Sequence, residues 1–384
     1  MTERVDVVVV GGGILGLATA RSLQRTDARR QVVVVEREQA VGQHQSSHNS
    51  GVLHAGVYYA PGSLKALLCR EGKRAMERYC AEHDIPIARN GKLVVAVDNS
   101  ELGRLDALIE RARANGVEGL RVLHGDELRD VEPNVAGMRA LHSPGTAVVD
   151  FGAVCEAVAD ELADVRLGVH VDAIDSRSGV VHVDTSAGSL EARHAVVCAG
   201  LWSERMAPSS ELRIVPFRGA WLVLRARAAA LVRGNVYPVP DPALPFLGVH
   251  LTRRVDGAVW AGPNAVLSLS QPRLLARAMR FSGTWRLFAQ QWRNGARELW
   301  RDQFRGAYVR EVARYLPALT VDDIEPGPRP FGVRAQAVRR DGTLVDDFVL
   351  DVRGRALHVL NAPSPAATSA FAIADLIADQ VARS

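Results

Sequence analysis

The chain opens on an alternation of apolar and polar segments that predicts a strand, a turn, a helix and a second strand within 36 residues. Valines fill positions 7–10 and 32–35, and a glycine-rich turn at 11–16 leads into an apolar helical stretch between them. A short continuous apolar run is typical of a strand buried on both faces. Such a β-α-β unit predicts a parallel sheet covered by helices.

The turn has the spacing Gly-x-Gly-x-x-Gly, formed by Gly11, Gly13 and Gly16, and Glu36 closes the unit. In dinucleotide sites these glycines allow a tight turn, backbone approach to a pyrophosphate, and close packing of helix on strand. The helix N-terminus offers N–H groups to phosphates, and the acid binds a ribose hydroxyl. In this context we expect a bound adenine dinucleotide rather than a plain glycine turn. The residues expected to contact it here are Gly11, Gly13, Ile14, Gly16, Glu36 and Arg37.

The patterning beyond residue 36 predicts helices and strands that return to the first unit. The expected helices are 67–82, 101–114 and 151–162; the expected strands are 91–97, 165–174, 180–185 and 195–200, with short proline-broken strands in 215–265. The last sixty residues predict a strand pair and a final helix opened by residues 361–367. Pro365 stands there at a position where helix starts tolerate proline.

This order of elements predicts an α/β fold with an interrupted cofactor domain. At 384 residues the chain is too long for one ordinary core. We expect a Rossmann-like FAD-binding domain, a parallel sheet with flanking helices, together with an antiparallel-sheet substrate domain. The first would comprise 1–85, 147–214 and 325–384, and the second 86–146 and 215–324. A nicotinamide dehydrogenase usually keeps its dinucleotide fold in one block, so the split layout favours FAD.

The composition narrows the location and the chemistry. No run of eighteen apolar residues occurs, and because the first residues lead directly into the first expected strand we expect no signal peptide. The four cysteines, Cys69, Cys80, Cys155 and Cys198, form no C-x-x-C pair and lack metal-ligand spacing. We therefore expect a cytoplasmic protein with reduced thiols and no metal site.

The net charge of +4 matters less than its distribution. The stretch 273–314 contains ten arginines against three acids, and Trp285, Phe288, Trp292 and Trp300 recur at near-helical spacing. A basic helix with an aromatic face can lie on an anionic membrane surface. For a cytoplasmic protein this would be the inner face of the membrane. The alternative is a helix whose aromatics pack into the core while its arginines are solvated. No nucleic-acid reading motif accompanies the charge, so no nucleic-acid partner is expected.

Several long strings closely resemble the L-2-hydroxyglutarate oxidase/dehydrogenase family, within the D-amino-acid oxidase-like FAD enzymes. They are HQSSHNSGVLHAGVYY at 44–59, PGSLKA at 61–66, GKLVVA at 91–96, IVPFRG at 214–219, PFLGVHLT at 245–252, GPNAV at 262–266, GVRAQ at 332–336 and NAPSPAATS at 361–369. Ser46-Ser47 stand where the family more often shows Thr-Gly, and Leu251 replaces a usual Phe. The stretch 268–314 matches poorly.

The resemblance implies oxidation of a 2-hydroxy acid, L-2-hydroxyglutarate, to a 2-oxo acid. A hydride would pass to flavin N5, a base would take the hydroxyl proton, and the electrons would go on to oxygen or a quinone. Two alternatives stay open. One is a flavoenzyme of the same fold acting on another 2-hydroxy acid, an amino acid or glycerol 3-phosphate. The other is a flavin-holding, membrane-docked partner without turnover.

This chemistry needs a cation for the α-carboxylate, a base for the hydroxyl and a polar clamp for the distal carboxylate. Arg334 is the candidate for the first, because a guanidinium holds a carboxylate with two hydrogen bonds. His54 and His250 compete as the base, since histidine titrates near neutrality. His54 is favoured beside the flavin ring and His250 against the substrate. The unranked candidates for the distal carboxylate are Tyr58, Tyr59, Lys65 and Arg218.

Further cofactor contacts are expected from the polar loop after Glu36 and from later segments. Small polar side chains in a glycine-flanked loop can donate to phosphates or to the flavin edge; here they are Gln45, Ser46, Ser47, Asn49 and Ser50, with Gly51. His44 and His48 are expected to order this loop. The later contacts, placed by the resemblance and by the expected helix start, are Val171, Ala199, Gly200, Asn361, Ser364, Pro365, Ala366 and Ala367.

Overall fold

A computed structural model describes residues 2–177, 179–244 and 247–383, so positions 245–246 of the family-like string lie outside the described residues. The strands are β1 Glu3–Val10, β2 Val32–Val35, β3 Val52–Leu53, β4 Ile87–Ala88, β5 Lys92–Ala96, β6 Arg121–His124, β7 Arg139–Ser143, β8 Ala147–Val149, β9 Val165–Arg166, β10 Val171–Arg177, β11 Val180–Thr185, β12 Gly188–Val197, β13 Leu212–Ala220, β14 Leu222–Val223, β15 Asn235–Pro238, β16 His250–Arg253, β17 Val259–Gly262, β18 Val266–Leu267, β19 Phe331–Arg339, β20 Val349–Arg353 and β21 Ala356–Asn361. The helices are α1 Ile14–Thr26, α2 Leu64–Glu82, α3 Asn99–Ala114, α4 Glu127–Val131, α5 Phe151–Asp160, α6 Ser203–Met206, α7 Ala226–Ala229, α8 Pro272–Met279, α9 Ser282–Gln303, α10 Arg305–Ala313 and α11 Ala370–Arg383, with short 3-10 turns η1 Gly200–Trp202 and η2 Val321–Asp323.

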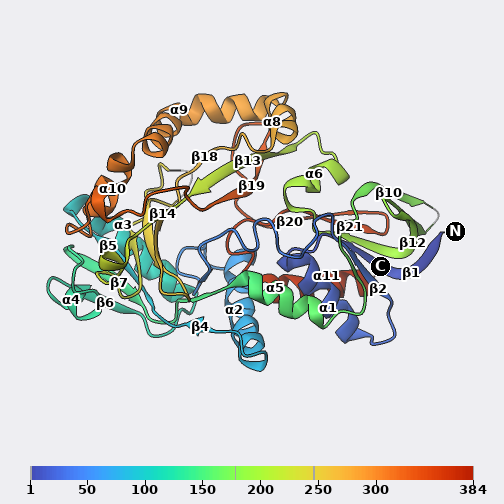
Figure 1. The fold of residues 1–384 in the computed structure, drawn as a ribbon, viewed down its shortest axis with the longest axis horizontal. Coiled ribbons are helices and arrows are strands. Elements are labelled where there is room, and N and C mark those ends of the chain that lie inside the picture. The colour runs from blue at the N-terminus through green and yellow to red at the C-terminus, as the bar shows by residue number, and fades with distance from the viewer. Residues whose placement is uncertain (1, 178, 245–246, 384) are drawn as a thin grey trace.

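The valine runs form the centre of an eight-stranded sheet. Its path is β10-β11-β12-β1-β2-β9, and β21 joins β12 while β20 pairs with β21. β1 runs parallel to both β2 and β12, and β21 is also parallel to β12. Helices α1, α5 and α11 lie together against this sheet in Figure 1, and their apolar side chains share its main core cluster. The predicted parallel sheet with flanking helices is therefore confirmed.

A second large sheet is built mainly from antiparallel pairs. Its order is β14-β17-β16-β15-β5-β7-β6, and only β15 and β5 pair in parallel. A three-stranded sheet, β18-β13-β19, lies between the two larger sheets in Figure 1. The long antiparallel pairing of β13 with β19 brings the middle of the chain against its last quarter. The antiparallel sheet was predicted, whereas the assignment of residue ranges to two domains stays a prediction.

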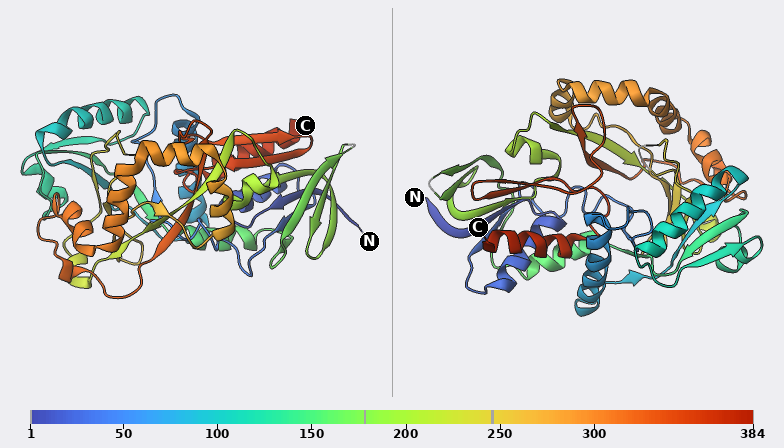
Figure 2. Two further views of the ribbon diagram at one scale, coloured as in Figure 1. Left: turned by 90° about the horizontal axis from the view of Figure 1, so that it is seen from above. Right: turned by 180° about the vertical axis from the view of Figure 1, so that it is seen from behind.

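The segment 273–314 is three helices rather than one, which corrects the expected single basic helix. α8, α9 and α10 follow one another, and Gln291 inside α9 has non-helical angles that mark a kink. Figure 1 shows α9 as a long orange helix above β13 and β19, and Figure 2 shows the same orange helix from two further directions. The breaks fall at residues 280–281 and 304, where the chain changes direction.

Other boundaries also differ from the pattern. The expected strand 165–174 is divided into β9 and β10. The helix expected from residue 67 begins at Leu64, because Ser63 caps it and its Oγ accepts a hydrogen bond from Ala66 N at 3.2 Å. The final helix begins at Ala370, and residues 364–369 form turns before it. Pro365 is therefore not a first-turn helix residue, although its carbonyl accepts a bond from Ser369 N.

Candidate active site

The glycine turn is packed so tightly that side chains are excluded from it. Gly11 has φ +109°, and a Cβ there would lie 2.5 Å from the carbonyl oxygen of Cys198 at the end of β12. At Gly16 a Cβ would lie 1.9 Å from the carbonyl oxygen of Gly11. The N-terminus of α1 thus stands directly over the carboxyl ends of β1 and β12. This is where a doubly wound sheet binds its ligand.

The acid that closes the first unit is fixed beside this turn. Glu36 is buried, and its Oε2 accepts a hydrogen bond from Gly12 N at 2.6 Å, while Oε1 accepts one from Glu38 N at 2.9 Å. A carboxylate has about four acceptor positions, so it retains capacity for ribose hydroxyls. Arg37 lies with its guanidinium 3.7 Å over the ring of Trp202 and also lines the cavity.

The polar loop after Glu36 is ordered by its own side chains. Ser46 Oγ accepts a bond from Ile14 N at 2.9 Å, so it caps the start of α1. Asn49 Nδ2 donates to the carbonyls of residues 45 and 46, and Ser47 Oγ donates to Gly42 O. Gln45 Nε2 reaches across to Val333 O in β19 at 3.1 Å. The main role of Ser47 and Asn49 is therefore to hold the backbone of this loop in place.

A cavity of about 2160 Å³ runs from this turn to the space between β13, β19 and β16. Small-molecule sites are typically about 300–1000 Å³, so there is room for a dinucleotide and a substrate together. Most of the predicted cofactor residues line it, namely Gly11, Gly13, Ile14, Glu36, Arg37, Gln45, Ser46, Asn49, Ser50, Val171, Ala199, Gly200, Ser364, Pro365, Ala366 and Ala367. Gly16, Ser47, Gly51 and Asn361 are not brought to its wall.

Asn361 has a different task from the predicted cofactor contact. Its Nδ2 donates to the carbonyls of Val345 and Asp347, and its Oδ1 accepts a bond from Ala337 N. These bonds tie the end of β21 to β19 and to the loop that follows it. The side chain is buried, so its polar groups are used within the protein.

All the predicted catalytic and substrate residues line this same cavity: His54, Tyr58, Tyr59, Lys65, Arg218, His250 and Arg334. Arg334 lies on β19 directly opposite Phe217 of β13. The residue has exposed surface, yet surrounding protein lowers the pKa of its guanidinium through burial. The exposed surface therefore faces the cavity rather than bulk water, as carboxylate binding requires.

His250 has its tautomer fixed by a backbone contact. Its Nδ1 lies 2.9 Å from Gly248 O, so Nδ1 carries the proton and Nε2 keeps its lone pair. The ring stacks on Tyr237 with centroids 3.9 Å apart. Burial is the main cause that lowers the pKa of His250 to about 3, and nearby cations add to it. The imidazole is neutral at neutral pH and can accept a proton.

His54 lines the same cavity and directly follows β3. Its backbone N–H donates to Thr368 Oγ1 at 3.1 Å, and its Nε2 lies 3.4 Å from Ser364 Oγ. Its Nδ1 is buried and has no partner among the described residues. Burial, followed by the charges of Lys92, His250 and Lys65, lowers the pKa of His54 well below its ordinary value. It is also neutral at neutral pH.

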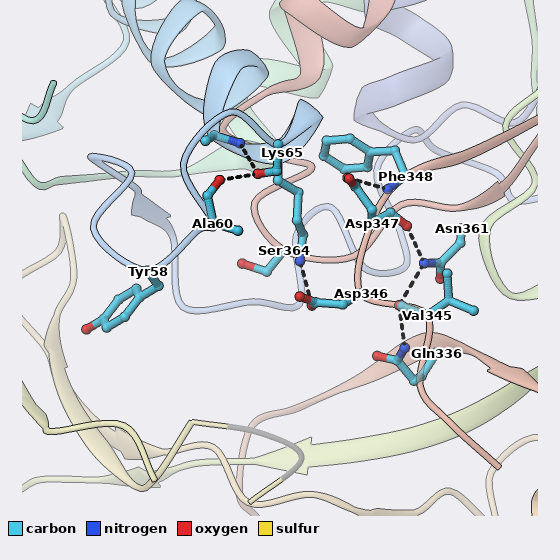
Figure 3. Close-up of polar contacts among 12 residues, drawn as sticks. Tyr58, Ala60, Lys65, Gln336, Val345, Asp346, Asp347, Phe348, Asn361 and Ser364 are labelled. Carbon is cyan, nitrogen blue, oxygen red and sulfur yellow. Dashed lines mark hydrogen bonds and ion pairs between the residues drawn. The ribbon is translucent and has the colours of Figure 1, made fainter. Parts of the chain in front are cut away.

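The candidates for the distal carboxylate differ in how far they are already engaged. Arg218 Nη1 lies 3.1 Å from Asp302 Oδ2, and Asp302, whose side chain is 9% exposed, also accepts bonds from Asn264 and Arg329. Lys65 Nζ instead lies 2.9 Å from Asp346 Oδ1, and Figure 3 shows it reaching from the start of α2 to that residue. Only the lysine is paired with a carboxylate that is itself exposed.

Residues 6–380 match the family described as FAD dependent oxidoreductase. The chain belongs to the FAD dependent oxidoreductase family. It is 43% identical over 417 residues to the mitochondrial L-2-hydroxyglutarate dehydrogenase of Nematostella vectensis, a match that covers 99% of this chain and 91% of the relative. The Homo sapiens mitochondrial L-2-hydroxyglutarate dehydrogenase is 41% identical (99% and 89% covered), and the L-2-hydroxyglutarate dehydrogenase of Indibacter alkaliphilus is 38% identical (97% and 98%).

Solved structures confirm the fold of this FAD dependent oxidoreductase. The L-alpha-glycerophosphate oxidase of Mycoplasma pneumoniae with FAD bound superposes with a TM-score of 0.76 at 20% identity, covering 100% of this chain and 94% of that chain. The glycine oxidase of Geobacillus kaustophilus gives 0.75 at 21% identity, covering 100% and 95%. At such identities the likeness concerns the fold, and the predicted FAD fold and cofactor are confirmed.

The residues of the cavity suit FAD on their own evidence. At Gly13 a Cβ would meet only Ser46 Oγ, at 3.2 Å, so the backbone there is open toward the cavity. No acid occupies the first turn of α1, so the helix dipole there favours an anion such as a phosphate. At the other end, Tyr58 Oη is buried and, like His54 Nδ1, has no partner among the described residues. Such polar atoms are normally satisfied by a ligand or water.

Sequence reasoning missed Lys92, which packs against two tyrosines of the cavity wall, Tyr58 and Tyr237. It lies on β5, is 2% exposed, and its ammonium is 4.2 Å from the ring centre of Tyr237 and 4.8 Å from that of Tyr58. Burial lowers its pKa to about 7. A lysine directly before the apolar run 93–96 was the available signal, because buried lysines are rare without a special environment.

The three tryptophans of α9 are exposed, whereas Phe288 packs against a core cluster. Trp285, Trp292 and Trp300 are each more than half exposed, as is Leu299. Trp292 and Leu299 also line the cavity. In the described part of the chain, no helix is both long enough and apolar enough to cross a membrane.

Proposed function

We propose that this FAD dependent oxidoreductase oxidises L-2-hydroxyglutarate to 2-oxoglutarate. The support from the comparisons is the set of L-2-hydroxyglutarate dehydrogenases that are 38–43% identical over nearly the whole chain. The observation in the structure that carries the proposal is one cavity lined by two basic side chains, Lys65 and Arg334, and by two imidazoles, His54 and His250. Burial is the main cause that lowers the pKa of both imidazoles, and the charge of Lys92 adds to it at each of them.

Two cations and two imidazoles in one cavity suit a five-carbon dicarboxylate, because each carboxylate can have its own cation. We infer that Arg334 holds the carboxylate next to the hydroxyl and that Lys65 holds the distal one. Such a substrate would pass His250 and His54 with its reacting carbon between the two cations. Tyr58 and Tyr59 would contact its middle, and Arg218 would act indirectly, because Asp302 already engages it.

The proposed base is His250, through its free Nε2. When bound, FAD supplies the acceptor for the hydride that leaves C2 with its two electrons. His250 takes the hydroxyl proton, so that the C–O single bond becomes the carbonyl of the 2-oxo acid. The bond from Nδ1 to Gly248 O and the stacking on Tyr237 hold the ring in the tautomer that this step needs. His54 would hydrogen-bond to the substrate beside it.

Anaerobic mixing of the holoenzyme with L-2-hydroxyglutarate, and separately with the D-enantiomer, tests this proposal. We expect the L-form alone to bleach the visible flavin absorbance. Exchange of His250→Asn keeps a donor for Gly248 O but removes Nε2, and should slow bleaching by about 10²–10⁴-fold. His54→Asn should slow it much less; the reverse ranking would make His54 the base. If neither enantiomer bleaches the flavin but an amino acid or glycerol 3-phosphate does, the assignment of L-2-hydroxyglutarate as the substrate is wrong.

We infer further that the electrons pass to oxygen or to a membrane quinone, and that α9 meets an anionic membrane. The arginine–aromatic face is defined here as the exposed side chains Trp285, Arg293, Arg297, Trp300 and Phe304. No carboxylate in the described part of the chain pairs with Arg293 or Arg297. Because Trp292 and Leu299 both line the cavity and stay exposed, an apolar rim joins this surface to the site, which favours a quinone.

The membrane proposal predicts salt-sensitive binding to vesicles that contain an anionic lipid. Reversing two charges, Arg293→Glu with Arg297→Glu, should weaken binding about 30-fold or more, since each basic residue contributes about 1 kcal/mol at such a surface. Binding should fade toward 1 M salt, where the screening length is about 3 Å. A matched control is Arg25→Glu with Arg121→Glu, two exposed arginines elsewhere. Failure of the wild type to co-sediment with these vesicles at low salt would remove the membrane partner.

A further inference from the structure

The ion pair between Lys65 and Asp346 is unequal in burial. The lysine side chain is 8% exposed, whereas the aspartate side chain is 97% exposed, and Nζ lies 2.9 Å from Oδ1. The two residues are 281 positions apart in the chain and both line the large cavity. The lysine lies in the first turn of α2 with its ammonium beside the ring of Tyr59.

The backbone on both sides of Asp346 is held firmly. Gln336 Nε2 and Asn361 Nδ2 both donate to Val345 O, at 3.0 and 3.1 Å, and Asn361 also donates to Asp347 O at 2.9 Å. Figure 3 shows these bonds on either side of the aspartate. The loop between β19 and β20 therefore need not open for Asp346 to leave the lysine. A rotation of its side chain into the adjacent open space is enough.

The two partners lose very different amounts when the pair separates. An exposed aspartate regains full hydration, and ion pairs at exposed positions contribute little. A buried ammonium, in contrast, is costly without a counter-charge. The lysine therefore requires a carboxylate near it, but not this particular one. A carboxylate brought by a ligand would satisfy it equally well and release the aspartate to water.

We propose that Asp346 is an internal carboxylate that occupies Lys65 in the free enzyme and exchanges with the distal carboxylate of the substrate. Asp346 thereby lowers the affinity for dicarboxylates and returns to the lysine as the product leaves. It is an affinity-determining residue and takes no part in the chemistry at C2. This inference rests on the proposed function, because it needs Lys65 as the clamp for the distal carboxylate.

The test is calorimetric titration of holoenzyme with 2-oxoglutarate, and with 2-oxobutyrate, which lacks the distal carboxylate. For Asp346→Asn we expect the Kd for 2-oxoglutarate to fall about 2- to 10-fold, since one competing exposed ion pair has been removed. The Kd for 2-oxobutyrate should stay within about twofold. A matched control is Glu118→Gln, which removes one negative charge from an exposed pair with Arg74. It should change neither constant.

A second pair of variants separates competition from a supporting role of the aspartate. In a Lys65→Met background, Asp346→Asn should no longer change the affinity for 2-oxoglutarate, because the two side chains act through one contact. A Kd for 2-oxoglutarate that is unchanged or raised in Asp346→Asn, with wild type binding normally, would overturn this proposal alone. If wild type binds no dicarboxylate at all, the proposed function fails and this inference fails with it.

Discussion

Replacement of Arg334 by methionine is expected to lower kcat/KM for L-2-hydroxyglutarate about 30- to 5000-fold. The range corresponds to about 2–5 kcal/mol, the usual cost of truncating one partner of a buried, hydrogen-bonded charge pair. The guanidinium lines the cavity on β19, and burial by the surrounding protein lowers its pKa. Its bond to the carboxylate is therefore made in a weakly screening environment, where it is strong.

A lysine at position 334 distinguishes charge from shape. Arg334→Lys keeps a positive charge but loses the planar fork that binds a carboxylate with two parallel bonds. We expect its kcat/KM to lie between those of the wild type and Arg334→Met. Arg339→Met serves as the control, since Arg339 lies on the same strand with its side chain exposed and outside the cavity. A loss below about threefold in Arg334→Met would remove Arg334 from the substrate site.

The parts of the site that could be predicted from the sequence are those that local physics fixes. Continuous valine runs identified the buried parallel strands, and the glycine spacing identified the turn between β1 and α1. Both depend on residues close together in the chain. The polar loop that contains Gln45 and Ser46 was also predictable, because small polar residues flanked by glycines disfavour a core element.

Pairings between distant segments could not be predicted in the same way. Nothing in the sequence around Lys65 indicates that Asp346 will neutralise it, because their contact depends on how β19 and α2 pack. Asn361 was expected at the cofactor because it opens the segment of the expected last helix start, yet its side chain bonds to three backbone groups. Arg218 looked as available as Lys65 until the structure placed Asp302 against it. Whether a charged side chain is available to bind a substrate therefore depends on which residues the fold places beside it.

The predicted start of the last helix was wrong for a related reason. The apolar pattern of the last segment continues backward through Ala366 and Ala367, so it suggests an earlier start than Ala370. In the structure, Thr368 Oγ1 instead accepts a bond from His54 N and contacts Val52 O. Residues 364–368 are thus shaped by the loop that they meet, which places Ser364 beside His54 in the cavity. The contact with the active site overrides the local helical preference.

Exchange of Gly16→Ala is expected to yield protein that no longer retains FAD. A Cβ at this position would lie 1.9 Å from the carbonyl oxygen of Gly11, so α1 would have to move away from the turn that should hold the pyrophosphate. Overpacking of this kind typically costs about 1–3 kcal/mol of stability. We expect the Kd for FAD to rise at least about tenfold, which is 1.4 kcal/mol. The ratio of flavin to protein absorbance and titration of the apoprotein with FAD measure this.

Two further alanines make this result interpretable. Gly13→Ala adds a methyl group whose nearest neighbour is a serine hydroxyl at 3.2 Å, so the chain can fold while the group obstructs the approach of a phosphate. It should weaken FAD binding even if Gly16→Ala fails to fold. Gly103→Ala, in α3, meets nothing within 4 Å and should keep full flavin while gaining up to about 1 kcal/mol from helix propensity. Normal flavin content in Gly13→Ala and Gly16→Ala would mean that this turn does not hold the pyrophosphate.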